Sequence, residues 1–371
     1  MLVIMLSILC GLVVGWLIYF LLQEKPKQIF KAKQFCHKPP PPPCDNCKKQ
    51  PTIFVSLASY RDDQCSNTVW ELFEKANCPS RIFVGLVQQN NSKEDSDCFS
   101  EYCCGPKNRF CRKDQIRIVR IPSQEAKGPT WARYIASKLY QGENYFMQID
   151  SHMRFLKGWD STAIRMLQDC PANKPVLTHY PLEYNVKSNK NPQQYKTHVP
   201  TLCRAEFNKD DMPELRAVSV PKQKFSYECP YISGNFFIAP GTIVDDVPFD
   251  PYLPHLFMGE EMLYSARAYC KNYRFYVPTE NVAFHYYERK GAPKFWDQIP
   301  DYRAIQRRSQ ERVKYIFGMI PKNKVKHPNE TFRELGKYGI ADRNMLKEYL
   351  TIFDIDVHKK KTSNKYCHLP E

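Results

Sequence analysis

The chain has 371 residues, a formal net charge of +15 at pH 7 and fifteen cysteines. That length is sufficient to bury a large hydrophobic core, either in one large domain or in two small ones. The basic residues are spread along the chain without a recognised nucleic-acid-binding signature, so an anionic membrane or an acidic substrate is favoured as the partner over nucleic acid, which stays open as an alternative.

The N-terminal segment has the composition of a membrane-spanning helix. Residues 1–23 carry no charged side chain, and the stretch from Leu2 to Leu22 is almost wholly apolar. About 20 such residues cross a bilayer as a helix. A cleaved signal peptide would have a basic leading segment and a shorter apolar core. The sequence therefore predicts an uncleaved, single-pass transmembrane anchor at residues 1–23, which makes the membrane an expected partner.

The side of the membrane that holds the rest of the chain is indicated by conflicting signals. The lysines that directly follow the span favour a cytosolic body under the positive-inside rule. All of the fifteen cysteines except Cys10 lie outside the span, and this even remainder favours disulfides in an oxidising lumen. Asn90 and Asn329 begin triplets that match the N-glycosylation pattern. The balance favours a lumenal body, in the endoplasmic reticulum or Golgi.

Residues 24–51 are rich in lysine and proline and are expected to form a stalk. The five consecutive prolines at positions 39–43 favour a stiff polyproline II spacer. Cys44 and Cys47 form a C-x-x-C pair, but no second pair with matching spacing supports a zinc site. We therefore expect a local disulfide or a cross-link between stalks.

From Thr52 onward, short apolar runs alternate with amphipathic stretches. This alternation predicts an α/β fold with a mostly parallel central sheet, in a domain that covers residues 52–300. Ligands of such sheets bind beyond the C-terminal ends of the strands. The expected strands are residues 53–59, 81–87, 116–121 and 145–149, and the expected helices are residues 64–77 and 129–140.

Four cysteines gather between the second and third of these strands. The spacing of Cys98, Cys103, Cys104 and Cys111 fits no common zinc pattern, so a surface loop stapled by disulfides is favoured over a metal site.

After residue 175 the expected elements are shorter, and residues 301–371 are expected to form a mainly helical, basic C-terminal extension that serves as an appendage or lid. The expected strands are residues 175–178, 201–207, 232–239, 274–277 and 282–285, and the expected helices are residues 259–269, 302–317 and 344–353.

The tetrad Ile149-Asp150-Ser151-His152 ends an apolar strand. Residues two apart on a strand project from the same face, so Asp150 and His152 are expected to point to the same side. His285 follows the apolar run of residues 282–284 and is either a third ligand or a satisfied core residue. Carboxylate and phosphate oxygens suit Mn or Mg, and imidazole favours Mn. These residues are predicted to hold the metal against a diphosphate.

Charged residues near two expected helix starts are candidates for contacts with a sugar-nucleotide that serves as the sugar donor. Arg61 and Asp62 follow the first strand and either contact a nucleotide or form a surface ion pair or helix cap. Arg133 lies one turn into the helix that begins at Pro129, where an anion is favoured, although a plain surface charge remains the alternative.

Glu260 and Glu261 open a later helix, where acidic residues are favourable in any case. Their functional interpretation is a carboxylate that orients the acceptor hydroxyl or stabilises positive charge on the donor sugar ring.

Several motifs that follow one another in order carry a family resemblance. They are Tyr60-Arg61-Asp62, Gly128-Pro129 with Ala132-Arg133, residues 148–155, Trp159-Asp160, residues 253–261 and Phe284-His285-Tyr286. Over about residues 52–290 the chain resembles the GlcNAc-transferase family that includes the hydroxyproline GlcNAc-transferase acting on Skp1. It is more distantly similar to the polypeptide GalNAc-transferases.

The resemblance implies a GT-A fold, a UDP-sugar donor with Mn or Mg, and transfer with retention of configuration. It implies a metal role for Asp150, His152 and His285, a donor contact for Arg133, and an active-site role for Glu260 or Glu261. The expected function is transfer of a sugar, with GlcNAc expected, from a UDP-sugar to a hydroxyl acceptor on protein or glycan. The alternatives are a non-catalytic glycan-binding surface protein with the same fold and, more weakly, a metal-dependent hydrolase. The Skp1-modifying enzyme has no membrane anchor, so the resemblance implies nothing about compartment or acceptor.

Overall fold

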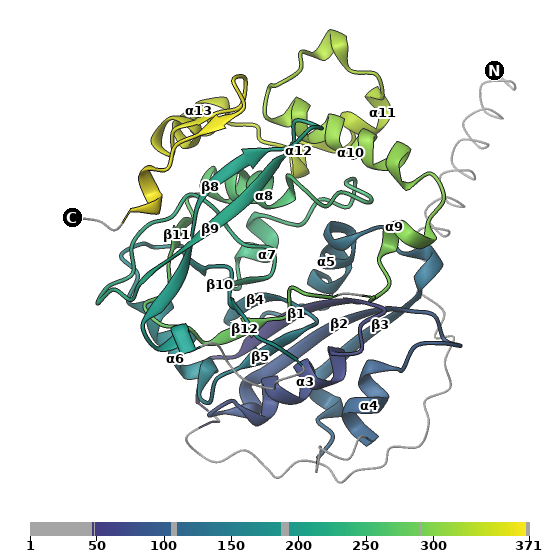
Figure 1. Ribbon diagram of the computed structural model, residues 1–371, viewed down its shortest axis with the longest axis vertical. Helices are drawn as coiled ribbons and strands as arrows, with labels where there is room; N and C mark the ends of the chain where they lie inside the picture. The colour runs from purple at the N-terminus through teal and green to yellow at the C-terminus, as the bar shows by residue number, and fades with distance from the viewer. Residues whose placement is uncertain (1–46, 48, 105–109, 187–192, 290, 369–371) are drawn as a thin grey trace, which may run out of the picture. The chain divides into compact units, whose positions relative to one another are not determined.

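The computed structural model describes residue 47 and residues 49–104, 110–186, 193–289 and 291–368. At the centre lies a seven-stranded sheet in the order β11-β6-β10-β4-β1-β2-β3 (Figure 1). Only β10 runs against its neighbours, which confirms the predicted α/β fold with a mostly parallel sheet. The strands are β1 (Ile53–Tyr60), β2 (Ile82–Asn90), β3 (Ile116–Pro122), β4 (Tyr145–Asp150), β6 (Pro175–Thr178), β10 (Phe236–Pro240) and β11 (Arg274–Tyr276).

Both faces of this sheet are covered. Alternate residues of β1 point to opposite faces, so Ile53 and Val55 belong to one core cluster and Phe54 to another. A Cβ at Gly85 would lie 2.3 Å from the Phe54 ring and 3.2 Å from the Ala136 carbonyl oxygen, so this glycine allows close packing of β2 against its helix. The covering helices are α3 (Cys65–Glu74) and α6 (Trp159–Gln168) on one face and α5 (Pro129–Ser137) and α8 (Glu260–Tyr269) on the other (Figure 1).

A small second sheet joins distant parts of the chain. It consists of β5 (Met153–Phe155), β12 (Ala283–His285) and β7 (Leu182–Glu183), with β12 in the middle. β12 pairs antiparallel with β5, so His285 lies opposite Met153. This pairing brings the third predicted ligand next to the end of β4.

Most of the predicted elements agree with the observed ones within a few residues, but several observed elements were not predicted. Helix α6 was not predicted, although its buried Trp159, Ala163 and Leu167 are four residues apart, as on one face of a helix. The strand β8 (His198–Phe207) was predicted, but β9 (Pro213–Pro221), the strand that pairs with it, was not. The short strands β5 and β7 were also missed.

The predicted strand at residues 232–239 was wrong in its first half. β10 begins only at Phe236, because the Ser233 hydroxyl accepts hydrogen bonds from the backbone N–H groups of Asn235 and Phe236. This side-chain bonding replaces a strand partner and bends the chain.

The residues after Asp301 contribute to the same core as the rest of the described chain. Val313 and Tyr349 pack in one cluster with residues of β4 and α8. Arg312, fully buried, donates a 2.7 Å hydrogen bond to Asp250. The helices of this part are α10 (Tyr302–Ile316), α11 (Pro328–Thr331), α12 (Leu335–Tyr338) and α13 (Arg343–Ile352), followed by β13 (Ile355–Asp356) and β14 (Lys361–Thr362). Two short helices, α7 (Ile243–Asp246) and α9 (Phe295–Gln298), precede it.

Four disulfides connect the described residues. Cys47 bonds to Cys78, so both predicted alternatives for Cys47, a local disulfide and a cross-link between stalks, were wrong. The cysteine-rich segment is stapled as predicted, but its first half is the helix α4 (Cys98–Cys104) and not a loop. Helix formation lets Cys103 and Tyr102 face the core beside α3. The four bonds are Cys47–Cys78, Cys65–Cys98, Cys103–Cys111 and Cys203–Cys367.

Within the described ranges, no helix combines the length and the apolar character that a membrane crossing requires. The anchor predicted at residues 1–23, and all of the predicted stalk except residues 47 and 49–51, lie outside the described residues.

Candidate active site

Three predicted ligands meet at the C-terminal end of β4. Asp150 is the last residue of β4, His152 lies in the turn to β5, and His285 ends β12. The Nε2 atoms of His285 and His152 lie 3.1 Å and 3.9 Å from Asp150 Oδ2. One ligand atom from each residue lies within 4.8 Å of the others, a spacing suitable for one shared cation.

Asp62 lies behind His152 and is almost completely buried. Its Oδ2 atom is 2.7 Å from His152 Nδ1 and accepts a 2.6 Å hydrogen bond from the Ser151 hydroxyl. Burial alone would raise the pKa of Asp62, but the His152 bond and the Arg289 charge lower it well below the ordinary value. An ionised Asp62 keeps the proton of His152 on Nδ1, which leaves the Nε2 lone pair directed at the Asp150 side.

The Asp62→Asn variant is therefore expected to bind Mn about 10- to 100-fold more weakly, because an amide holds the His152 tautomer less well than a carboxylate. Isothermal titration with Mn measures the dissociation constant. Asp63→Asn, at the exposed neighbouring position, is the matched control. Unchanged Mn affinity in Asp62→Asn would show that Asp62 only supports the fold.

His285 is suited to binding a cation through one nitrogen. Burial lowers the pKa of His285 to about 4, so the ring is neutral at neutral pH. Its Nδ1 atom is buried and has no hydrogen-bond partner among the described residues. One carboxylate with two imidazoles is a donor set that accepts Mn, so the residues fit the predicted divalent cation.

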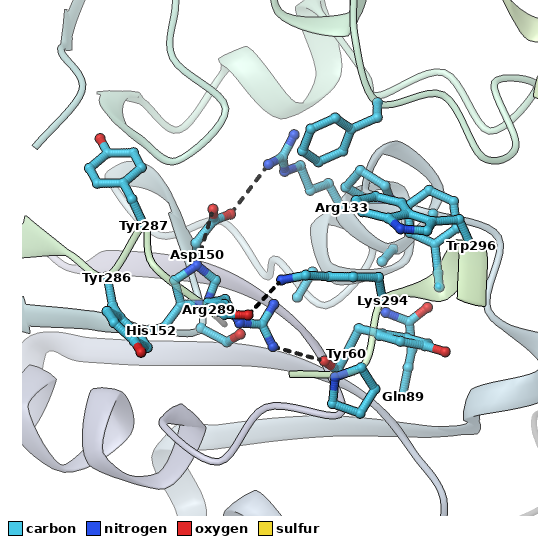
Figure 2. Close-up of a pocket in the computed structure, with 18 of the residues that line it drawn as sticks. Tyr60, Gln89, Arg133, Asp150, His152, Tyr286, Tyr287, Arg289, Lys294 and Trp296 are labelled. Atoms are coloured by element: carbon cyan, nitrogen blue, oxygen red, sulfur yellow. Dashed lines mark hydrogen bonds and ion pairs between the residues drawn. The ribbon is translucent and has the colours of Figure 1, made fainter. Parts of the chain in front are cut away.

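A cavity of about 280 Å³ opens in front of these residues (Figure 2). Arg289 donates a 3.4 Å hydrogen bond to the Tyr60 carbonyl, and Lys294 donates one of 3.4 Å to the Arg289 carbonyl. Figure 2 shows the Lys294 side chain extending toward Arg289. Burial, and then the Arg289 charge, lower the pKa of Lys294. Two cations held together in a cavity favour an anionic ligand.

Arg289, Lys294 and Trp296 also line this cavity but were not predicted as site residues. They belong to a segment with no periodic pattern, and the available signal was the position of Arg289 four residues after His285. Trp296 adds an aromatic surface, which is typical of pockets that bind a planar ring.

Arg133 contacts both Asp150, from the predicted metal site, and Glu260, from the predicted acidic pair. One guanidinium nitrogen lies 2.6 Å from Glu260, and another donates a 3.3 Å bond to Asp150 Oδ1, an interaction drawn in Figure 2. A Cβ at Gly234 would lie 2.8 Å from this guanidinium, so the glycine leaves room for it. Arg133 is thus held by Glu260 and lines the cavity beside Asp150.

Glu261 faces a second cavity of about 260 Å³, which shares Asp150, Arg133 and His285 with the first. Its carboxylate accepts a 2.5 Å hydrogen bond from the Tyr180 hydroxyl and a 2.6 Å bond from the Gly234 N–H. Burial, and then the Glu260 charge, raise the pKa of Glu261 to about 7. A carboxylate that titrates near neutral pH suits proton transfer or the orientation of a hydroxyl.

Arg61 points away from the main cavity. It forms ion pairs with Asp95 at 2.8 Å and with Glu94, and it lines a separate cavity together with Asp62. Of the four predicted nucleotide-contact residues, Arg133 and Asp150 line the main cavity, whereas Arg61 and Asp62 are not among its lining residues.

Comparisons with known structures support the fold assignment. A crystal structure of GalNAc-T7 with UDP, GalNAc and Mn²⁺ superposes with a TM-score of 0.55 at 15% identity, covering 87% of this chain. The chain spans 59% of the length of that protein. Residues 1–349 of TarS from S. aureus, in complex with UDP-GlcNAc, match at a TM-score of 0.40 and 12% identity, covering 83% of this chain and 89% of the other. At these identities the GalNAc-T7 similarity shows a shared GT-A-like fold.

The sequence comparisons identify the family. No curated protein matches the chain by sequence. The family model "Glycosyltransferase (GlcNAc)" matches residues 52–108 and 101–359, which together make up most of the chain. The match confirms the family expected from the ordered motifs, and the chain belongs to the GlcNAc glycosyltransferase family.

Proposed function

We propose that this protein is a metal-dependent, retaining glycosyltransferase that moves GlcNAc from UDP-GlcNAc to a hydroxyl on a protein or a glycan. The observation that carries the proposal is the meeting of Asp150, His152 and His285 beside two cavities that share Asp150 and His285 in their linings. A donor that spans both cavities would have its diphosphate beside these three residues. The structure of GalNAc-T7, which shares the fold, was determined with UDP, GalNAc and Mn²⁺.

The two cavities have linings suited to different parts of the donor. The first combines Trp296 and Tyr60 with the cations Arg289 and Lys294, and is proposed to take the nucleotide. Arginine and lysine side chains donate charge-assisted hydrogen bonds to phosphate oxygens. The second cavity, which contains Glu261, is proposed to take the sugar and the acceptor hydroxyl.

Asp150, His152 and His285 would hold Mn or Mg. When bound, the cation supplies positive charge that stabilises the departing diphosphate. Asp62 orients His152 for this role, and Arg289 and Lys294 place two further charges near the leaving group. Glu261 holds the acceptor hydroxyl by accepting its hydrogen bond, while Glu260 keeps Arg133 in position beside Asp150.

The Glu261 carboxylate is expected to control the pH dependence of transfer. With a folded-state pKa of about 7 against an ordinary value of 4.5, the charged form increases between pH 6 and 8, roughly one unit on each side of that pKa, and transfer should rise with it. Glu261→Gln should lower kcat about 100-fold and remove this rise. A profile of kcat against pH tests both statements. A rise that persists in Glu261→Gln would assign it to another group.

The raised pKa of Glu261 also makes the free energy of unfolding depend on pH. Because the folded-state pKa is raised, the stabilising contribution of protonated Glu261 is complete below pH 4.5 and is lost as the pH rises through about 7. Glu261→Gln should therefore flatten the decrease in unfolding free energy over this window, as measured by urea titration.

The function itself is tested with the full-length protein in detergent and a panel of UDP-sugars, with and without Mn. We expect UDP release from UDP-GlcNAc above other UDP-sugars, and only with Mn or Mg present. Failure to bind UDP in the presence of Mn would instead favour the non-catalytic, glycan-binding alternative.

We further propose that residues 1–23 anchor the protein in a membrane and that its body lies in an oxidising lumen. Four disulfides support the lumenal side, including one that links Cys203 to Cys367 across 164 residues. Protease treatment of sealed vesicles should leave the body intact, and digestion without detergent would place it in the cytosol.

A further inference from the structure

A separate cavity of about 530 Å³ has Lys127 and Trp131, near the start of α5, among its lining residues. We call it the aromatic–basic groove, and define it by five of the side chains that line it. They come from the segment before α5, from α5 itself, from the loop after α7, from α10 and from the segment between α11 and α12. The five are Lys127, Trp131, Tyr252, Arg308 and Arg333.

The groove carries a surplus of positive charge beside aromatic rings. Lys127, Arg308 and Arg333 are exposed, and the one acidic residue in the lining, Glu330, lies 3.0 Å from Arg308. Lys127 Nζ lies 5.2 Å from the centre of the Trp131 ring. The Arg333 guanidinium lies 4.5 Å from the centre of the Tyr252 ring. Cation–π contacts of this kind hold the charged groups along the rings.

The aromatic–basic groove stands on a rigid base. Below Tyr252 the fully buried Arg312 is bonded to Asp250, with its guanidinium 5.5 Å from the centre of the Tyr252 ring. The Tyr252 hydroxyl donates a 2.6 Å hydrogen bond to Glu334. Such a base preserves the shape of the groove, so a ligand need not order it on binding.

The groove and the main cavity share one short piece of chain. Gly128 and Pro129 line the main cavity, whereas their neighbours Lys127 and Trp131 line the groove. The His255 N–H donates a 2.6 Å hydrogen bond to the Lys127 carbonyl. This bond links the loop after α7, which contributes Tyr252 to the groove, to the segment before α5. Lys127 and Trp131 are therefore each within two residues of a residue that lines the main cavity.

We propose that the aromatic–basic groove binds an acidic saccharide that forms part of the acceptor, an inference that rests on the proposed transferase function. The two arginines have planar forks that match carboxylate, sulfate or phosphate groups. Trp131 and Tyr252 line the groove beside these cations and add apolar aromatic surface against which a pyranose can pack.

An extended acidic peptide fits this surface less well. Two of the lining residues, Pro251 and Pro254, have no N–H to pair with a peptide backbone. The Pro254 carbonyl already accepts a 2.7 Å hydrogen bond from Ser309. Charged groups and ring faces therefore provide the recognition here, which favours a saccharide over a strand-like peptide.

The proposal is tested by binding of a heparin octasaccharide to the full-length protein in nanodiscs of neutral lipid. A neutral chitin hexasaccharide and a glutamate-rich peptide of matched charge are the comparison probes. The double variant Lys127→Glu/Arg333→Glu should weaken heparin binding at least 10-fold. Lys209→Glu/Lys224→Glu, which changes the net charge equally at exposed positions outside the groove, should have little effect.

Three results would overturn the proposal: no measurable heparin binding, equal loss in both double variants, or equally tight binding of the peptide. Metal-dependent UDP release from UDP-GlcNAc should be unchanged in Lys127→Glu/Arg333→Glu, because neither side chain lines the main cavity. Failure of that release in the unmodified protein would refute the proposed function, whereas the saccharide measurement would still decide whether the groove binds its ligand.

Discussion

Replacing Asp150 with alanine is expected to lower metal-dependent UDP release by roughly 1,000-fold, the scale of effect seen when a group that stabilises developing charge is removed. Asp150 supplies the one carboxylate of the three-residue cluster. Its Oδ2 atom also lies 3.1 Å from His285 Nε2, and its Oδ1 atom accepts a hydrogen bond from Arg133 that orders the site. UDP release measured over a range of Mn concentrations gives both the rate and the apparent Mn affinity.

The control for this variant is Asp169→Ala, which removes a carboxylate that is 68% exposed and outside the lining of both cavities that meet at Asp150. It should behave like the unmodified protein. His152→Ala should share the loss of the Asp150 variant. Full metal-dependent activity in both Asp150→Ala and His152→Ala would contradict the assigned metal site.

The Glu260→Ala variant is expected to lose about 3–5 kcal/mol of unfolding free energy, because it removes the closer partner of the buried Arg133 charge and leaves only the longer 3.3 Å bond to Asp150. The Arg133 and Glu260 side chains are 8% and 5% exposed and lie 2.6 Å apart. Urea unfolding followed by circular dichroism measures the change. The double variant Arg133→Met/Glu260→Ala should recover a large part of the loss, since no buried charge is stranded.

The exposed ion pair between Glu280 and Arg165 is the control that distinguishes loss of a buried ion pair from loss of an exposed one. Glu280 is 43% exposed and contacts Arg165, so Glu280→Ala should cost less than about 1 kcal/mol. If Glu260→Ala were as mild as Glu280→Ala, the Arg133 charge would have to be solvated or paired elsewhere, and its proposed place beside Asp150 would need revision.

The parts of the fold that depend on local pattern could be predicted from the sequence. The four strands β1 to β4 and the helix α5 were found because continuous apolar runs, turn residues and the Gly128-Pro129 start are local signals. The hairpin partner β9 was missed, because its register depends on contacts with β8 and its middle residues are exposed. The predicted strand start at Ile232 failed because the Ser233 hydroxyl competes for the backbone.

The candidate site also combines features that the local sequence pattern predicts with features that depend on distant contacts. Asp150 and His152 could be placed together because they are two residues apart on one strand end. Nothing local relates them to His285, 133 residues beyond His152; β12 must pair with β5 to bring it there. Likewise, Glu260 and Glu261 were equivalent in the sequence. Their helical positions direct one at Arg133 and the other at Tyr180 and the second cavity.

The sequence by itself determined the alternation of strands and helices, the family and the chemical types of the candidate ligands. The tertiary structure decided what each charge faces: Asp62 supports His152 instead of lining the main cavity, Arg61 is bound by Asp95, and Arg289 and Lys294 enter that cavity. The physical reason is that spacing along a chain specifies which side of a strand or helix a residue occupies. The partner of a side chain is set by packing between distant segments.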